Sequence, residues 1–272
     1  MNWFVQYFQN IPSSHRALIL AGGLTFFWLI ESAVPLFTFK YNKWKHAGVN
    51  IFFTVTTIIV NFAFALLIVY TSDFCVKNKF GVLQWISMPL WLQLIIGLML
   101  LDFVGAWLIH YIEHKIKWMW KFHVIHHSDT HVDTTTANRH HPGESVFRAV
   151  FTTLAVLICG APMWLVFLYQ SLSVLLSQFN HANIKMNRSL NKLLSFIIVT
   201  PNMHRIHHHY VRPETDTNFG NIFPFWDKVF HTYSKTPAEN IHYGLDTLAG
   251  RNDEDLKDLL KIPFSNSIKT DY

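Results

Sequence analysis

The segment Ile86–Ile112, ISMPLWLQLIIGLMLLDFVGAWLIHYI, is an almost unbroken apolar run that ends in a histidine cluster. A helix needs about 20 apolar residues to cross a bilayer. This run is longer, so we expect its C-terminal end to project out of the membrane. His110 and His114 lie at that end, four residues apart on one helix face. The segment therefore predicts a membrane span that presents two imidazoles at the bilayer surface.

Two other apolar runs, Ala17–Phe37 and Val49–Tyr70, are also long enough to cross a bilayer. A fourth, Val146–Phe179, is interrupted by the tripeptide GAP at 160–162. Proline removes a backbone donor and clashes with the preceding turn, so one continuous helix is disfavoured there. We therefore expect three spans followed by a membrane hairpin. The two helices of the hairpin are expected at Phe147–Cys159 and Met163–Phe179.

The composition agrees with this interpretation. The chain has 272 residues, of which 51% are hydrophobic and only 14% are charged, whereas a soluble domain is about 25% charged. These values exclude a disordered chain, a collagen, a disulfide-rich mini-protein and an ordinary soluble globule. Cys75 and Cys159 stand far apart and predict packing rather than a disulfide framework. We expect an all-α, polytopic membrane protein with a single domain over 1–272 and a polar tail over 250–272.

The distribution of Lys and Arg predicts how the chain is oriented. Of its 22 Lys and Arg, only Arg16, Lys77 and Lys79 lie in segments that would face the outer side. Because positively charged loops stay in the cytoplasm, the N-terminus is expected outside and the histidine clusters inside. The net charge of +5 then reflects cytoplasmic loops rather than nucleic-acid binding. The expected location is the membrane, as a multi-pass protein of the inner or plasma membrane if the chain is bacterial.

Eight of the 17 histidines fall in clusters with helical spacing. Positions i, i+3 and i+4 lie on one helix face, so each H-x-x-H-H cluster points up to three imidazoles the same way. Neutral imidazole is the commonest side-chain ligand for mid-row divalent metals. One ion takes about four protein ligands in a structural zinc site, so eight imidazoles predict two ions. The clusters are His110 and His114, then His123, His126 and His127, then His204, His207 and His208.

Other functions compete with a two-metal enzyme, and a His-rich metal transporter or metal-binding protein is the main alternative. A transporter should carry histidines and acids at the bilayer midplane, but the expected span interiors hold little besides Asp102 and Asn61. A zinc hydrolase needs about three ligands, far fewer than this chain offers. The sequence HPGE at 141–144 is similar to the haem motif of cytochrome b5 but lacks its second glycine.

Several other polar and aromatic residues are expected to be structural. Asp102 lies about 12 Å deeper than His110 along the third span, where an unpaired carboxylate is costly. We expect it to pair with Asn61 or with a tryptophan N–H. Trp118 and Trp120 most simply anchor the chain at the interface, with the lining of a lipid channel as the alternative. The histidines expected to be ordinary are His15, His46, His131, His231 and His242.

The order of the three clusters around a membrane hairpin resembles the fatty acid hydroxylase / sterol desaturase superfamily, in particular its bacterial sterol-desaturase-like members. The likeness includes WKFHVIHHSDTHVDTTTANRHHPGES at Trp120–Ser145, FNHANI at Phe179–Ile184 and TPNMHRIHHHY at Thr200–Tyr210. It continues through ETDTNFGNIFPFWDKVFHTY at Glu214–Tyr233. The resemblance thus covers about residues 90–245, more than half of the chain.

This resemblance implies transmembrane helices capped by a cytosolic helical domain that holds two iron ions. It also implies an oxidoreductase that uses O2 to hydroxylate or desaturate a lipid, whether fatty acyl, sterol-like or isoprenoid. The first motif of the family usually has arginine where this chain has Tyr111, off the ligand face, so ligation should survive. The ligands implied by the motifs are His110, His114, His123, His126, His127, His181, His204, His207 and His208, with His141 as a tenth candidate.

Groups that orient the ligands and supply electrons are expected as well. A metal-bound histidine usually donates its second ring N–H to an acceptor that fixes its tautomer. The sequence has no ferredoxin cysteine set, nucleotide-binding loop or cytochrome b5 motif, so we expect a separate electron donor, ferredoxin- or cytochrome b5-like. The Lys-rich face would suit an acidic partner. The candidate acceptors are Asp129, Asp133, Glu144, Asp216 and Asp227.

Overall fold

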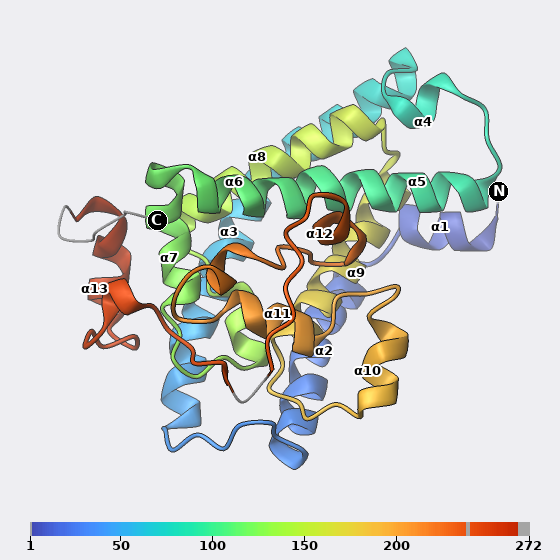
Figure 1. Ribbon diagram of the computed structural model, residues 1–272. Coiled ribbons are helices and arrows are strands. Elements are labelled where there is room, and N and C mark those ends of the chain that lie inside the picture. Colours follow the sequence, from blue (N-terminus) through green and yellow to red (C-terminus); the bar gives the residue numbers. More distant parts are fainter. Residues whose placement is uncertain (1, 238–239, 266–272) are drawn as a thin grey trace.

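The structure is a computed structural model that describes residues 2–237 and 240–265. Within these ranges the regular elements are all helical (Figure 1). The all-α, polytopic architecture expected from the sequence is confirmed, and the chain is an integral membrane protein. The helical stretches that are long and apolar enough to cross a bilayer are Ser13–Ala33, Lys43–Trp85, Leu90–Lys115 and Pro142–Cys159.

The first two spans keep their expected places but differ at their ends. α2 (Ser13–Ala33) stops short of the expected Phe37, because the residue before Pro35 leaves helical backbone. α3 (Lys43–Asn78) begins earlier than expected, because the Asn42 side chain accepts a backbone N–H of the first turn and caps the helix. The short helices α1 (Trp3–Gln9) and α4 (Val82–Trp85) flank these spans.

The third span is continuous but changes its winding before it reaches the histidines. A π-helical turn, η1, interrupts the α-helical hydrogen bonding, and such turns are frequent at functional sites. The rings of Phe103, Trp107 and Tyr111 form a stack along this turn, with successive centroids 5.8 and 5.3 Å apart. The hydropathy of the run does not predict this turn. The span consists of α5 (Leu90–Asp102), η1 (Phe103–Leu108) and α6 (Ile109–Lys115).

The fourth apolar region is broken where the sequence predicts. α8 (Pro142–Cys159) and α9 (Met163–His181) are separated at Gly160, whose φ of +70° ends α8 in the left-handed region. α8 packs along α3 and η1, whereas α9 packs against α1 and α2. The two halves therefore have different main neighbours, and α9 returns the chain to the histidines at the end of the third span.

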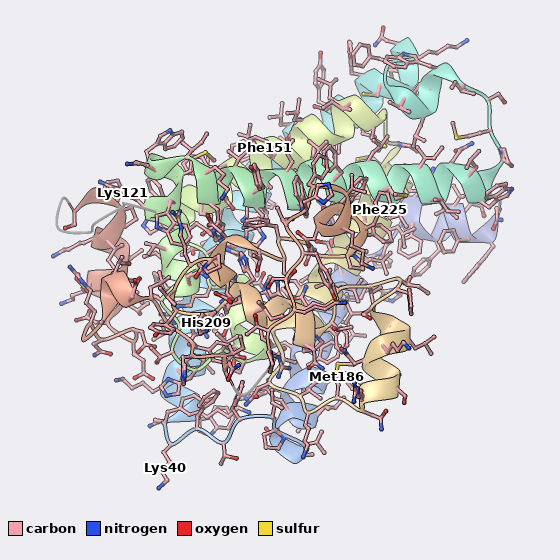
Figure 2. All side chains as sticks on the ribbon, in the orientation of Figure 1. Lys40, Lys121, Phe151, Met186, His209 and Phe225 are labelled. Atoms are coloured by element: carbon pink, nitrogen blue, oxygen red, sulfur yellow. The ribbon has the colours of Figure 1, made fainter. Side chains whose placement is uncertain are left out.

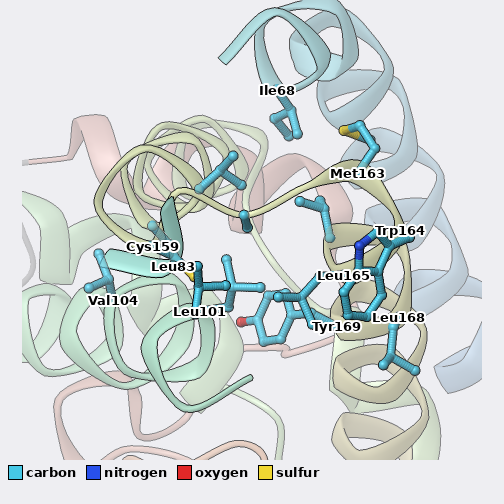
Figure 3. Close-up of a cluster of buried hydrophobic side chains, with 14 of the residues drawn as sticks. Ile68, Leu83, Leu101, Val104, Cys159, Met163, Trp164, Leu165, Leu168 and Tyr169 are labelled. Atoms are coloured by element: carbon cyan, nitrogen blue, oxygen red, sulfur yellow. The ribbon is translucent and has the colours of Figure 1, made fainter. Parts of the chain in front are cut away.

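A hydrophobic core joins these helices away from the histidines (Figure 3). Leu101 and Val104 from the third span, Cys159 from α8, and Leu165 and Tyr169 from α9 belong to it, and all are buried. Cys159 is a free thiol, and so is the second cysteine of the chain, which is also buried. The sequence prediction that both cysteines are packing residues is therefore confirmed.

The remaining helices cover the histidine end of the spans. Trp120 of α7 is only 1% exposed, and its ring centroid lies 4.7 Å from that of His114. Its expected role as an interface anchor is therefore wrong, whereas Trp118 is 56% exposed and suits that role. The covering helices are α7 (Lys117–His127), α10 (Arg188–Leu194), α11 (Pro201–His207), α12 (Phe225–Val229) and α13 (Leu256–Lys261), with the 3-10 turns η2 (Thr134–Asn138), η3 (Glu214–Asp216), η5 (Asp246–Leu248) and η6 (Ile262–Phe264).

The expected polar tail is folded as far as the structure describes it. Leu259 and Ile262 are 1% and 2% exposed and belong to an apolar cluster with Trp120 of α7. The tail packs against α7 because α13 is a short amphipathic helix, with apolar side chains on its buried face and charged side chains on the other. The last part of the expected tail, 266–272, lies outside the described residues.

A substitution at Gly81 tests the packing at the end of the fold away from the histidines. Gly81 has a φ of +98°, and a Cβ there would lie 2.4 Å from both the Cα and the backbone N of Gly160. We expect Gly81→Ala to lower the free energy of unfolding in detergent by about 2 kcal/mol or more, because the strain and the backbone clash add. The measurement is the thermal midpoint of the purified protein.

The matched control for this prediction is Gly48→Ala. A Cβ on Gly48 meets nothing within 4 Å, and alanine in a helix is about 1 kcal/mol more favourable than glycine. The control should therefore leave the midpoint unchanged or raise it. Equal midpoints for the two variants would contradict the close contact at Gly81.

Candidate metal centre

Helices α6, α7, α9 and α11 bring nine histidines together at the end of the third span. The ring nitrogens fall into two groups, and within each group one nitrogen per residue lies within 4.8 Å of the others. All nine side chains are buried. Group one consists of His110, His114, His123, His127 and His207, and group two consists of His126, His181, His204 and His208. The helical H-x-x-H-H spacing thus divides each cluster between two adjacent groups.

In group one, two ring nitrogens face each other with no proton between them. The Nδ1–H of His110 donates to the carbonyl oxygen of Phe219 at 2.9 Å, and that of His123 donates to Glu144 at 2.8 Å. The Nε2 atoms of these two rings, which then carry lone pairs, are 3.1 Å apart. Burial lowers the pKa of His123 to about 3, although Glu144 opposes the shift, so this ring is neutral. The facing lone pairs repel unless a cation lies between them.

Group two converges on His181. Its Nδ1–H donates to the carbonyl oxygen of Ser177 at 2.7 Å, which leaves a lone pair on Nε2. That Nε2 lies 3.2 Å from the Nε2 of His126 and 3.0 Å from the Nε2 of His204. Burial lowers the pKa of His126 and His204 well below the usual range, so both rings are neutral and able to bind a metal.

The two groups fit metal ions in two respects. These are the distances between their ring nitrogens and the presence of ring nitrogens without a hydrogen-bond partner. Two nitrogens at right angles around one ion, each at about 2.1 Å, would be about 3.0 Å apart, close to the separations observed. A buried polar nitrogen without a partner costs about 1–3 kcal/mol, so several of them at one place are typical of a metal site. The Nε2 atoms without a hydrogen-bond partner in the two groups are those of His114, His207 and His208.

Two of the expected carboxylates contact candidate ligands directly. Glu144, at the start of α8, holds His123 as described above. Asp216 accepts the Nδ1–H of His114 at 3.1 Å and binds the Lys115 ammonium at 2.6 Å. Burial opposes ionisation of Asp216, but the hydrogen bond from His114 and the charge of Lys115 lower its pKa to about 2. Both carboxylates are therefore placed to fix the tautomer of a ligand.

Asp227 acts on a candidate ligand through the backbone. Its carboxylate accepts the backbone N–H groups of Phe219 and Gly220, each at 2.9 Å. These bonds fix the peptide whose carbonyl oxygen accepts the Nδ1–H of His110. Asp227 therefore positions His110 without touching it.

Asp129 and Asp133 differ from expectation, because among the described hydrogen bonds they reach His46 and not one of the nine histidines. His46 Nε2 lies 2.9 Å from Asp129, and its Nδ1 lies 3.4 Å from Asp133. His46 is fully buried in α3, so the expectation that it is an ordinary loop residue is wrong. The Tyr41 hydroxyl completes this network by donating to Asp133 at 3.1 Å. His46 lies 83 residues from Asp129, so no local spacing could have found it.

His140, and not its neighbour His141, lies beside the two groups. The Nδ1 of His140 is 2.6 Å from Glu144, and its ring stacks on that of His126 with centroids 4.8 Å apart. His141 instead accepts the Gly143 N–H at 3.0 Å and caps α8, and it belongs to neither group. The sequence favours His141 over His140 because His141 is the histidine of the motif HPGE, and His140 lies outside the helical spacing of the clusters.

Comparison with known proteins agrees with this geometry. The family described as "Fatty acid hydroxylase" matches residues 94–232, which is about half of the chain and includes all nine histidines. Ornithine lipid hydroxylase OlsE from Rhizobium tropici is 27% identical over 154 residues, 57% of this chain and 44% of that protein. Human alkylglycerol monooxygenase is 28% identical over 60% of this chain and 34% of that protein.

A third relative is a cholesterol 25-hydroxylase-like protein from Caenorhabditis briggsae, which is 30% identical over 62% of this chain and 56% of that protein. The chain matches less than half the length of the first two relatives. No solved structure gives a significant match. The family match nevertheless covers the whole histidine-rich region. The chain therefore belongs to the fatty acid hydroxylase family, within the fatty acid hydroxylase / sterol desaturase superfamily.

Proposed function

We propose that the chain is a membrane-bound di-iron oxidoreductase that uses O2 to hydroxylate a C–H bond of a lipid. The convergence of neutral imidazole nitrogens in two adjacent buried groups carries this proposal, because neutral imidazole is the commonest side-chain ligand for mid-row divalent metals. Iron bound there would supply the activation of O2 that an unactivated C–H bond requires. The sequence leaves hydroxylation and desaturation open, and the names of the relatives, hydroxylases and monooxygenases, favour hydroxylation.

The residues of the chain have separate tasks in this proposal. Group one and group two would each hold one ion through Nε2 atoms. Behind at least five of the nine rings an acceptor holds the proton on Nδ1, which keeps the metal-facing Nε2 free. Trp120 and Phe219 pack on His114, with ring centroids 4.7 and 5.0 Å away, and exclude water from group one. These tasks together keep the ligands neutral, oriented and dry.

We further propose that electrons come from a separate donor protein that approaches near Asp216. This carboxylate joins a candidate ligand, His114, to the partly exposed Lys115. Through Asp216, His114 therefore comes within one side chain of the surface. The ammonium of Lys115 would attract an acidic ferredoxin- or cytochrome b5-like partner.

Metal analysis of anaerobically purified protein tests the two-ion proposal. We expect two irons per chain, with one or both lost from His126→Ala and from His207→Ala, because each removes one ligand of a different group. The measurement is iron per chain by elemental analysis. His242→Ala, at an exposed position outside both groups, is the control and should keep both ions. One iron in the unmodified protein, or full metal content in both ligand variants, would contradict the assignment.

Glu144→Gln tests whether the Glu144 carboxylate strengthens metal binding by His123. Glutamine keeps a hydrogen-bond acceptor beside His123 but removes the charge, so iron affinity should fall about 10–100-fold. Competition with a chelator measures this change. Glu254→Gln, which removes only a surface ion pair with Lys45, should leave the affinity unchanged. Equal affinities for the two variants would show that Glu144 does not act on the metal.

Lipid analysis of cells tests the reaction itself. Cells that express the chain should accumulate a lipid that is heavier by one oxygen atom, and cells that express His207→Ala should not. Mass spectrometry of total lipid extracts measures the difference. A loss of two hydrogens would identify desaturation instead, and no lipid change at all would refute the proposed activity.

A further inference from the structure

Two buried carboxylates tie the segment 218–232 to the middle of the third span. Asp102, at the end of α5, accepts the backbone N–H groups of Ile222 at 3.1 Å and of Phe223 at 3.2 Å. It also accepts the indole N–H of Trp226 in α12 at 3.2 Å. The expected tryptophan partner of Asp102 is thus Trp226, and the carboxylate serves a loop rather than another span.

The same loop also accepts a hydrogen bond from an indole of the span. Asp227 of α12 accepts the indole N–H of Trp107 at 3.0 Å, and Trp107 lies in η1. The two pairs, Asp102 with Trp226 and Trp107 with Asp227, are reciprocal, because each segment gives one carboxylate and one indole. Asp227 also accepts two backbone N–H groups of the loop, as described above. The loop is therefore held at two points along the span.

These bonds fix the depth of α12 relative to the membrane. Asp102 lies about 18 Å from the start of the span at Leu90 and about 20 Å from its end at Lys115, at 1.5 Å per residue. A bilayer core is about 30 Å thick. A helix bonded to the middle of the span therefore lies at the depth of the lipid chains, not in the water beyond the end of the span.

The outward face of α12 is apolar, as contact with lipid chains requires. Phe225, Val229 and Phe230 are 48%, 46% and 45% exposed. The Phe230 ring stacks on Phe103 of the third span with centroids 5.5 Å apart, so this apolar surface continues that of the span. Figure 2 shows Phe225 beside the long helix of the third span.

Helix α10 and the turn after it extend this surface. Leu190, Leu193, Phe196 and Ile197 are 48%, 65%, 70% and 65% exposed. The ammonium of Lys228 in α12 lies 5.9 Å from the Phe196 ring, which places the two segments next to each other. The basic residues Arg188 and Lys192 are also exposed on α10. Large apolar side chains with a basic rim are typical of helices that lie in a membrane interface.

We propose that 188–197 and 223–230 are inserted in the bilayer leaflet on the histidine side, beside the third span, with lipid as their partner. Non-helical backbone is tolerated at membrane depth only where its polar groups are satisfied by protein. Asp102 and Asp227 satisfy four backbone N–H groups of this loop, two each. The carboxylates thus allow an irregular segment to lie where lipid would otherwise leave those groups unpaired.

The loop 218–232, which carries the inserted segment 223–230, also contacts the candidate metal centre. Phe219, whose carbonyl oxygen holds His110, belongs to this loop, and its ring centroid lies 5.5 Å from that of His207. On the proposed function, lipid would therefore approach group one from the side of the leaflet, past this loop. The insertion itself does not depend on the metal or on the reaction.

Spin labels on single cysteines of the full chain, reconstituted in phosphatidylcholine–phosphatidylglycerol vesicles, test the insertion. We expect labels at Leu193→Cys, Phe225→Cys and Phe230→Cys to collide with lipid-soluble O2 several times more than with a water-soluble nickel chelate. The two native cysteines are buried free thiols, and labelling of the unmodified chain gives the background. The spin relaxation of these labels in the presence of O2 and of the nickel chelate should match that of a label at a lipid-facing position.

Two control positions give the ratio of O2 to nickel collisions expected in lipid and the ratio expected in water. Leu66→Cys, at an 81% exposed position in α3, gives the value for lipid, and Lys257→Cys, at an exposed position in α13, gives the value for water. Ratios at 193 and 225 near that of Leu66→Cys support the insertion. Ratios equal to that of Lys257→Cys would overturn it and would leave the metal proposal intact. Because Phe230 packs on Trp107, a misfolded Phe230→Cys leaves the other two positions to decide.

Discussion

The structure depends on the burial of nine uncharged imidazoles whose free nitrogens point at one another. Water cannot satisfy these nitrogens, because all nine side chains are buried. Protonation cannot satisfy them either, because burial lowers the pKa of rings such as His127 and His208 far below neutrality. The pair of metal ions that we propose has the charge and size to satisfy them. The rest of the fold can be understood as the means of holding these rings in place.

The rings are held from their outer side by acceptors of different strength. His110, His181 and His207 donate to carbonyl oxygens of Phe219, Ser177 and Thr217, whereas His114 and His123 donate to carboxylates. A carboxylate makes the ring a better electron donor to a metal than a carbonyl does. In group two, the described acceptors are backbone carbonyls, that of Ser177 for His181 and that of Asn218 for His204. The two ions would therefore be bound in unlike environments, with the more electron-rich ligands at group one.

The sequence predicts those features that depend on local spacing. Eight of the nine histidines are predicted by the spacing that puts them on one helix face, whereas His181 is implied only by the family resemblance. The break at Gly160 is predicted because proline interrupts a helix. His46 and His140 were missed because their partners come from other helices or from outside the clusters. The π-helical turn was missed because Phe103 and Trp107 have the same hydropathy in either winding. Long-range contacts such as Asp102 with Trp226, 124 residues apart, leave no periodic signal.

The hydrogen bonds of Asp102 explain why a carboxylate lies deep in an apolar span. Replacing Asp102 with a leucine of similar size would leave two backbone N–H groups and an indole N–H unpaired, at about 1–3 kcal/mol each. The loop from 218 to 232 could then no longer lie against the span, and Phe219 would move with it. Because the Phe219 carbonyl orients His110, the geometry of group one depends on a carboxylate about 12 Å deeper in the membrane. A buried acid of this kind is thus part of the metal centre in function, although it touches none of its ligands.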